Sequence, residues 1–254
     1  MLPKIIHYCW FGSNPIPELE KKCIESWKKT FPEFKLMFWN EETFDINSCL
    51  FTKIAYEHAQ YAFVSDYVRV KALYDFGGIY VDTDYEFIKN ICDIIEKYDN
   101  ILGWENKYYI GTAFMAFTPK HEIIEYLLDY YNKSNLRKNE IDTTANVAIL
   151  TNLLTKYGLK IDKTRQVILN IQIFERDYFY PKKNNNNFDI SQNTCGVHHY
   201  SMSWLSERQK KRGNNFFWRK IIRPILKMCQ VIANKLIGYK RIKPFEIWIR
   251  KKLR

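Results

Sequence analysis

The chain has 254 residues, of which 46% are hydrophobic and 17% are aromatic, and it carries a formal net charge of +11. A chain of this length and composition can bury a sizeable core, which argues against disorder over most of the sequence. The first residues are too polar for a signal peptide, and no apolar run reaches about 18 residues, so no transmembrane helix is predicted.

The positive charge is concentrated near the end of the chain. Residues 207–254 contain 16 Lys and Arg against 2 Asp and Glu, a net charge of +14, which leaves residues 1–206 with a net charge of −3. A basic body would indicate a nucleic-acid-binding protein, and this distribution does not. The six cysteines show no C-x-x-C spacing, which argues against a zinc site and favours reduced thiols in a cytoplasm.

The first elements predict an α/β sheet. Residues 3–10 are apolar and β-branched and predict a core strand, followed by a loop rich in Gly and Pro. Residues 18–30 predict an amphipathic helix with Leu19, Cys23, Ile24 and Trp27 facing inward, and residues 34–39 predict a second strand. Ligands of open α/β sheets collect beyond the carboxyl ends of strands, so Trp10 is either a platform for a flat base or a core residue.

The next stretch, residues 65–86, predicts a helix, a stop and a strand. Ser65 is a good N-cap, and Asp66 suits the positive end of the helix. Gly77 and Gly78 predict the end of the helix, because glycine adopts the left-handed conformation common there. Residues 79–81 then predict a short buried strand.

Carboxylates follow that strand directly. Asp82 and Asp84 are two residues apart, so in an extended chain they point the same way and can hold Mg²⁺ or Mn²⁺. On the preceding helix Asp66 and Arg69 share a face, where the arginine offers planar donors for phosphate or sugar oxygens. Taken separately, each pair could equally be solvated carboxylates or a surface ion pair.

The combined pattern is more specific. Residues 65–84 read S-D-x-x-R-x-x-x-L-Y-x-x-G-G-I-Y-x-D-x-D, which resembles the DXD sugar-binding region of glycosyltransferase family 32. That family includes bacterial capsular polysaccharide transferases and fungal mannosyltransferases, and it is related to the glucosylating domains of large clostridial toxins. The opening segment around Trp10 is similar to the family's first strand, whose tryptophan lies on the uracil of the donor.

The resemblance implies a set of site residues. Asp66, Arg69, Asp82 and Asp84 would carry catalysis, with Asp66 orienting the donor sugar. The nucleotide-sugar would also contact residues elsewhere in the pattern and near both ends of the domain: Trp10, Ser65, Tyr80, Ser203 and Trp204. The expected cofactor is Mn²⁺ or Mg²⁺, and the expected donor is a UDP-sugar transferred with retention of configuration.

After the aspartates the sequence alternates between helices and strands. Helices are predicted over residues 91–98, 121–131 and 144–157, and strands over residues 101–104 and 112–117. The polar loop 132–142 could line the acceptor side, and Asn146 could reach the sugar. Residues 182–187 form a low-complexity polar loop.

A second family-like segment covers residues 196–204, GVHHYSMSW. Its two adjacent histidines point in opposite directions if the segment is extended, so one of them faces a site. Its H-x-x-x-S-W ending resembles the family's C-terminal signature, which implies His199 as a third metal ligand and donation from Ser203 and Trp204 to the diphosphate. A histidine ligand would favour Mn²⁺ over Mg²⁺. The alternative is a structural histidine pair.

The tail mixes basic clusters with aromatic and aliphatic residues over 216–254, a pattern typical of interfacial membrane helices. A helix packed on the core with a solvated basic face is the alternative.

The sequence therefore predicts an α/β catalytic domain of the GT-A type with a central mixed sheet over residues 1–206, followed by a basic helical tail over 207–254. The predicted function is metal-dependent sugar transfer to a surface polysaccharide or lipid-linked glycan, with no nucleic-acid partner. The expected location is the cytoplasm, on the inner face of the cell membrane. A non-catalytic scaffold of a polysaccharide assembly complex is the alternative, and a phosphodiesterase would need more metal ligands than the sequence offers.

Overall fold

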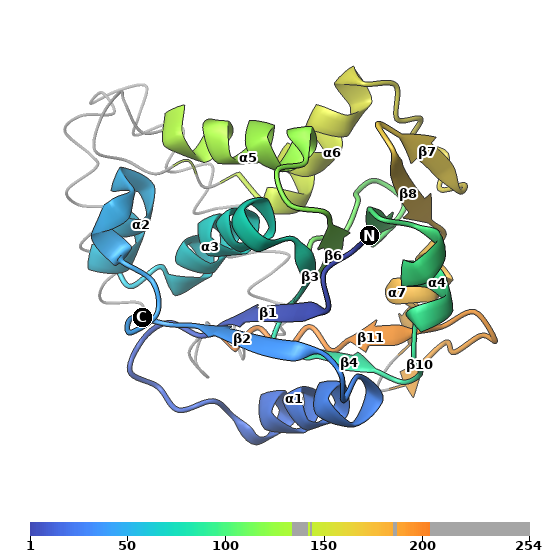
Figure 1. Ribbon diagram of the computed structural model, residues 1–254, viewed down its shortest axis with the longest axis horizontal. Coiled ribbons are helices and arrows are strands. Elements are labelled where there is room, and N and C mark those ends of the chain that lie inside the picture. The colour runs from blue at the N-terminus through green and yellow to red at the C-terminus, as the bar shows by residue number, and fades with distance from the viewer. Residues whose placement is uncertain (134–141, 143, 185–186, 204–254) are drawn as a thin grey trace, which may run out of the picture. The chain divides into compact units, whose positions relative to one another are not determined.

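The computed structural model describes residues 1–133, 142, 144–184 and 187–203 (Figure 1). Met1–Tyr200 form one compact unit, and Ser201–Arg254 are assigned to a second. The first unit contains the sheet and the helices described below. The domain boundary at residue 206 stays a prediction.

A seven-stranded mixed sheet lies at the centre of the first unit, in the order β2-β1-β3-β6-β5-β8-β7. Its strands are β1 (Ile5–Cys9), β2 (Lys35–Trp39), β3 (Gly78–Val81), β5 (Ile101–Gly103), β6 (Phe114–Phe117), β7 (Gln166–Ile168) and β8 (Ile171–Phe174). β1 runs parallel to both β2 and β3, whereas β6 is antiparallel to β3 and β5. β8 is parallel to β5, and β7 is antiparallel to β8. The predicted α/β fold with a central mixed sheet is confirmed.

Helices cover both faces of this sheet. They are α1 (Glu18–Thr30), α2 (Leu50–Glu57), α3 (Tyr61–Phe76), α4 (Cys92–Lys97), α5 (Glu122–Lys133), α6 (Asn146–Lys156) and α7 (Arg176–Phe179), with a short 3-10 turn η1 (Ile46–Ser48). In Figure 1, α3, α5 and α6 lie on one side of the sheet and α1 lies on the other. Two hydrophobic clusters result, one on each face.

The first helix occupies the predicted residues, but one inward assignment is wrong. Cys23, Ile24 and Trp27 are buried as predicted, whereas Leu19 is 37% exposed and Glu20 is buried. The buried stripe follows positions 20, 23, 24 and 27 at helical spacing, so Leu19 falls beside it. The indole Nε1 of Trp27 donates to the Tyr85 carbonyl at 2.6 Å, which ties α1 to the strand that follows the aspartates.

The central helix begins earlier than predicted. α3 starts at Tyr61 with Gln60 as the N-cap, so Ser65 and Asp66 lie inside the helix and the predicted Ser65 cap is wrong. No residue between Tyr61 and Val64 disfavours a helix strongly, and Val64 is fully buried there. The end is as predicted, because Gly77 takes a φ of 63° and caps the helix.

A small second sheet joins distant segments. β4 (Tyr85–Phe87) pairs antiparallel with β11 (Gly196–His198), and His198 lies opposite Tyr85. A Cβ on Gly196 would lie 2.6 Å from the Tyr85 ring, so the close approach of these strands requires glycine there. Around the predicted polar loop, β9 (Lys183–Asn184) pairs antiparallel with β10 (Asn187–Phe188), and residues 185–186 between them lie outside the described residues.

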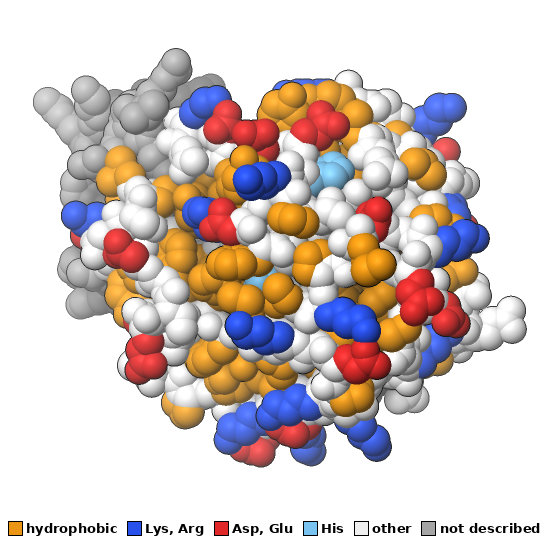
Figure 2. Space-filling model, in the orientation of Figure 1, with side chains coloured by type: hydrophobic (Ala, Val, Ile, Leu, Met, Phe, Trp, Pro, Cys, Tyr) orange, Lys and Arg blue, Asp and Glu red, His pale blue; other side chains and the backbone are white. Residues whose placement is uncertain are grey.

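Several other features bear on the earlier expectations. The five cysteines among the described residues are free. No helix in the described part of the chain combines the length and apolarity needed to cross a bilayer. Figure 2 shows acidic and basic side chains interspersed over the described surface of one face. Sequence periodicity did not identify α2 or the β7–β8 pair, whose edge strand β7 is only three residues long.

Candidate active site

The carboxyl edge of the sheet brings Trp10 and the aspartates to the same side of the molecule. Trp10 follows β1 and Asp82 follows β3, and these parallel strands are neighbours with His7 opposite Tyr80. Trp10 is half-buried, its backbone N–H donates to the Trp39 carbonyl at 3.0 Å and its indole Nε1 donates to the Asn14 carbonyl at 2.7 Å. These hydrogen bonds fix the tryptophan at the carboxyl end of β1.

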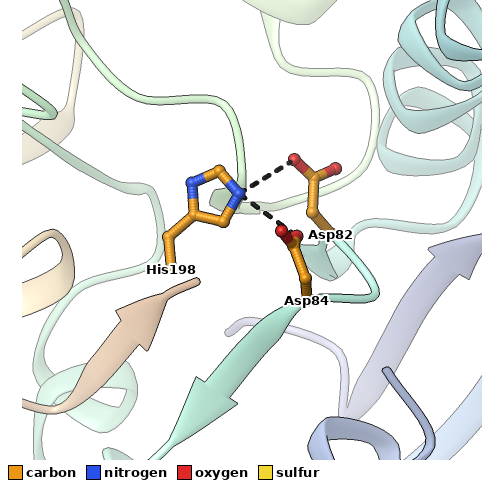
Figure 3. Close-up of side chains that lie close together, drawn as sticks. All are labelled: Asp82, Asp84 and His198. Carbon is orange, nitrogen blue, oxygen red and sulfur yellow. Dashed lines mark ion pairs between the residues drawn. The ribbon is translucent and has the colours of Figure 1, made fainter. Parts of the chain in front are cut away.

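The two aspartates lie on a tight turn between β3 and β4. The Tyr85 N–H donates to the Asp82 carbonyl at 2.9 Å and closes the turn, while the Asp82 N–H donates to the Ala113 carbonyl at 2.9 Å. Both carboxylates point toward His198, but the cause is this turn and not the extended backbone expected from the two-residue spacing (Figure 3).

Asp82, Asp84 and His198 form a group suited to a metal ion, with one potential ligand atom from each within 4.8 Å of the others. The Nε2 atom of His198 lies 3.2 Å from Asp84 Oδ1 and 4.0 Å from Asp82 Oδ2. The Asp82 side chain is 26% exposed, compared with 8% for Asp84. The opening toward a ligand is therefore on the Asp82 side.

The structure does not bring His199, the predicted metal ligand, to the aspartates. The Nε2 atom of His199 lies 2.9 Å from Glu86 Oε2 instead. Val197 pairs with Glu86, so His199, two residues further along, lies on the Glu86 face, whereas His198 lies on the Tyr85 face. Asp84 precedes β4 on the turn, and its carboxylate points to His198 instead of following the alternation of the strand. The predicted opposite directions of the two histidines are observed, and the one at the aspartates is His198.

His198 lies in a crowded, largely buried position. The centroid of its ring lies 4.0 Å from the centroid of the Tyr200 ring. Its Nδ1 atom has no hydrogen-bond partner among the described residues. Burial by itself would lower the pKa of His198, but the hydrogen bond and charge of Asp84, followed by Asp82 and Glu105, raise it overall. The ring therefore sits in a strongly acidic environment, which also favours a cation.

Arg69 holds the other side of the motif. Its guanidinium lies 2.9 Å from Asp66 Oδ1 and 3.1 Å from Asp82 Oδ1, and it donates to the Thr112 carbonyl at 2.9 Å. It also lies over the Tyr80 ring, 4.6 Å from the centroid, while the Tyr80 hydroxyl donates to Asp82 at 2.9 Å. Burial would lower the pKa of Arg69, but Asp82, Tyr80 and Asp66 raise it well above its ordinary value, so the group stays charged.

Asp66 completes this network. It accepts a hydrogen bond from the Asn146 amide at 2.6 Å, so the structure places Asn146 on Asp66. Burial raises the pKa of Asp66 to about 6, although Arg69 and Asn146 act in the opposite direction. The half-buried Ser65 contributes its carbonyl, which accepts from Arg69 Nε at 3.4 Å.

The remaining predicted residues are not placed at the site. Ser203 belongs to the second unit, and Trp204 and the basic tail 207–254 lie outside the described residues, as does most of the loop 132–142. Sequence reasoning missed Glu105, which interacts with His198 and Asp82. Glu105 follows β5 by two residues, and only the strand order, which no local pattern gives, brings that end of β5 to the edge where Asp82 lies.

The residues present fit a divalent cation. Two carboxylate oxygens and one imidazole nitrogen converge, and the adjacent Arg69 satisfies the second side of Asp82 without entering the group. Mixed oxygen and nitrogen donors of this kind suit Mn²⁺ better than Mg²⁺, which prefers oxygen alone.

Comparison with known proteins adds an independent finding. Residues 17–106 match the family described as "Glycosyltransferase sugar-binding region containing DXD motif". Lactosylceramide 4-alpha-galactosyltransferase of Mus musculus is 39% identical over 69 residues, which are 27% of this chain and 18% of that protein. The chain thus spans less than a fifth of the length of this relative.

Two further proteins are similar over longer stretches. An uncharacterised glycosyltransferase of Acanthamoeba polyphaga mimivirus is 25% identical over 224 residues, covering 80% of this chain and 83% of that protein. The solved structure of PaToxG glycosyltransferase superposes with a TM-score of 0.47 at 18% identity, covering 61% of this chain and 68% of that chain. The resemblance recognised in the sequence is confirmed: residues 17–106, which contain Asp66, Arg69, Asp82 and Asp84, match the DXD-containing sugar-binding region of glycosyltransferases.

Proposed function

We propose that this chain is a metal-dependent retaining glycosyltransferase that moves a sugar from a UDP-linked donor to a hydroxyl group of a glycan. The observation that carries the proposal is the convergence of Asp82, Asp84 and His198 at the sheet edge that also presents Trp10, within a DXD region. Open α/β sheets bind their ligands at this edge.

The donor would lie along the edge from β1 to β3. Trp10 would stack on the uracil, and Asp82, Asp84 and His198 would hold a divalent ion. Such an ion, when bound, supplies positive charge that stabilises the leaving diphosphate. Arg69 adds a permanent positive charge and fixes the Asp82 carboxylate, since its donors already contact Asp66, Asp82 and Thr112.

Asp66 would orient the donor sugar. Its carboxylate is held by Arg69 on one side and by Asn146 on the other, so its position is fixed before a sugar binds. A preorganised carboxylate can accept hydrogen bonds from sugar hydroxyls without paying for its own ordering again.

The acceptor we propose is a surface polysaccharide or a lipid-linked glycan precursor. The mouse relative supports the second option, because its name specifies galactosyl transfer to lactosylceramide. We further propose a cytoplasmic protein that binds the inner face of the cell membrane through residues 207–254, whose net charge is +14. Full-length protein should then bind anionic vesicles more tightly than neutral ones, and equal binding to both would contradict this localisation.

The proposal is tested by thermal unfolding with a panel of UDP-sugars and Mn²⁺. A donor at about a hundredfold excess over its dissociation constant should stabilise the folded chain by roughly 2.7 kcal/mol. The same screen with GDP-sugars and with Mg²⁺ separates the nucleotide from the ion. No stabilisation by any UDP-sugar with Mn²⁺, together with no donor hydrolysis or transfer, would contradict a catalytic function and favour a scaffold.

A further inference from the structure

Glu105 lies at the same sheet edge as the aspartates. It follows β5 by two residues, and β5 runs parallel to β3 because both strands are antiparallel to β6. The carboxyl end of β5 therefore opens on the side where Asp82 leaves β3. Glu105 is half-buried and belongs neither to the predicted motif nor to the Asp82–Asp84–His198 group.

The loop that carries Glu105 is closed by hydrogen bonds. The Glu105 N–H donates to the Tyr109 carbonyl at 3.0 Å, and Trp104 forms a bridge with Ile110. Inside the loop the Asn106 side chain accepts from the backbone N–H groups of Tyr108 and Tyr109 at 2.9 and 3.1 Å. The backbone that holds the Glu105 carboxylate is thus fixed at the end of a buried strand.

The side chain of Glu105 interacts with groups from three other segments. Tyr200 offers its hydroxyl, His198 and Asp82 lie on the metal side, and Arg176 contributes positive charge from the start of α7. Arg176 is anchored there because its Nε donates to the Tyr180 carbonyl at 2.9 Å. Burial raises the pKa of Glu105, whereas His198, Tyr200 and Arg176 favour the charged form and Asp82 opposes it.

The order of the strands places Glu105 on the far side of the aspartates from Trp10. Along the edge, Trp10 follows β1, the aspartates follow β3, Glu105 follows β5 and Arg176 follows β8. A donor whose base lies at Trp10 and whose diphosphate lies at the aspartates would direct its sugar toward the β5 end. The partner of that sugar must then approach from the side of Glu105 and Arg176.

We propose that Glu105 binds the acceptor: its carboxylate, supported by Tyr200 and Arg176, accepts hydrogen bonds from hydroxyl groups of the glycan that receives the sugar. A carboxylate held by one hydroxyl donor retains free lone pairs for one or two sugar hydroxyls. This inference rests on the proposed function, since it takes the donor side at Trp10 and the aspartates as given.

The test compares Glu105→Gln with the matched control Glu125→Gln. Glu125 on α5 also receives a tyrosine hydroxyl, from Tyr74 at 3.3 Å, but it is exposed and lies outside the sheet edge. Each variant is titrated calorimetrically with UDP and Mn²⁺. Each is then assayed for transfer from the UDP-hexoses to p-nitrophenyl glycosides of galactose, glucose, mannose and N-acetylglucosamine.

We expect Glu105→Gln to raise the acceptor KM by about tenfold, the cost of one charge-assisted hydrogen bond, with UDP–Mn²⁺ affinity unchanged. Tyr200→Phe, which keeps the ring on His198 but removes the hydroxyl, should raise the same KM by a smaller factor. Glu125→Gln should match the wild type in both measurements.

Three results would overturn the inference while leaving the proposed function intact. If Glu105→Gln keeps the wild-type acceptor KM, Glu105 does not bind the acceptor. If Glu105→Gln loses affinity for UDP and Mn²⁺, Glu105 acts on the donor side instead. Wild-type protein that binds UDP and Mn²⁺ but uses none of the glycosides would also count against it. Wild-type protein that fails to bind UDP and Mn²⁺ at all would refute the proposed function itself.

Discussion

The two aspartates of the DXD motif are held in different ways. Asp82 is fixed from the α3 side by Arg69 at 3.1 Å and by the Tyr80 hydroxyl at 2.9 Å. Asp84 faces the β11 side, where its carboxylate lies 3.2 Å from the Nε2 atom of His198. The α3 side is a buried network of ion pairs within the folded core, whereas the β11 side is the group of side chains that could hold a metal ion.

Because of this difference, we expect the Arg69 side to determine the stability of the fold and the His198 side to determine metal binding. The Arg69 side chain is only 7% exposed, and removing one member of a buried ion pair leaves the others uncompensated. Within the described residues the Nδ1 atom of His198 has no hydrogen-bond partner, and its Nε2 atom contacts the Asp84 carboxylate of the candidate metal group. Variants on the α3 side should therefore affect folding, and variants on the β11 side should affect the metal.

The largest effect should come from Asp84→Ala. Loss of this carboxylate removes a ligand while leaving the Arg69 network untouched, and we expect the rate of sugar transfer to fall by about a thousandfold. The turnover of the sugar donor at saturating Mn²⁺ measures this rate. Glu86→Ala, on the neighbouring face of β4, is the control. If Asp84→Ala transfers sugar at a rate close to that of the wild type, Asp84 is not a ligand of the metal ion.

Arg69→Ala should instead destabilise the fold. We expect a loss of about 3–5 kcal/mol in the free energy of unfolding, because Asp66 and Asp82 are left buried without their partner. Arg69→Lys should lose about 1–3 kcal/mol, since an ammonium cannot reach both carboxylates and the Thr112 carbonyl together. Urea denaturation of both variants gives these values. An unchanged denaturation midpoint for Arg69→Ala would show that the network contributes no more to stability than a surface ion pair does.

Replacing the two histidines one at a time should show which face of β11 binds the metal ion. His198→Ala is expected to weaken Mn²⁺ binding by about a hundredfold, whereas His199→Ala removes only a contact with Glu86 and should leave Mn²⁺ affinity unchanged. Calorimetric titration with Mn²⁺ in the presence of UDP compares them. The reverse order of affinities would restore the assignment of His199 made from the sequence.

Asp66 gives the smallest and most pH-dependent effect. Its pKa is raised to about 6 in the folded chain from 3.8, so its contribution to stability is present below about pH 3.8 and is lost as the pH rises through 6. The stability of the wild type relative to Asp66→Asn should therefore fall by on the order of 2 kcal/mol between pH 4 and pH 7. Chemical denaturation across this range measures it, and a relative stability that rises with pH would contradict the burial of Asp66.

Local signals in the sequence predicted much of this fold. The helix of residues 18–30, the glycine stop at Gly77 and the strand before Asp82 follow from periodicity and backbone preference, and all three are observed. The start of α3 could not be located, because Tyr61–Val64 are compatible with a helix and only the burial of Val64 decides it.

The site was predictable only where it is local in sequence. Asp66, Arg69, Asp82 and Asp84 lie within one short stretch, and the structure brings them together as expected. The choice between His198 and His199 depends on the pairing of β4 with β11 and on the turn that directs the Asp84 carboxylate to His198, and no local pattern reveals either. Glu105 was missed for a similar reason, since only the strand order shows that β5, one strand beyond β6, ends at the same sheet edge as β3.

The central claim is that Asp82, Asp84 and His198 together hold the divalent ion. Electron spin echo spectroscopy of the Mn²⁺–UDP complex tests it directly, because an imidazole nitrogen bound to Mn²⁺ modulates the echo. We predict this nitrogen modulation in the wild-type chain and in His199→Ala, and its loss in His198→Ala. Nitrogen modulation that is absent from the wild type, or that disappears in His199→Ala and persists in His198→Ala, would contradict the account.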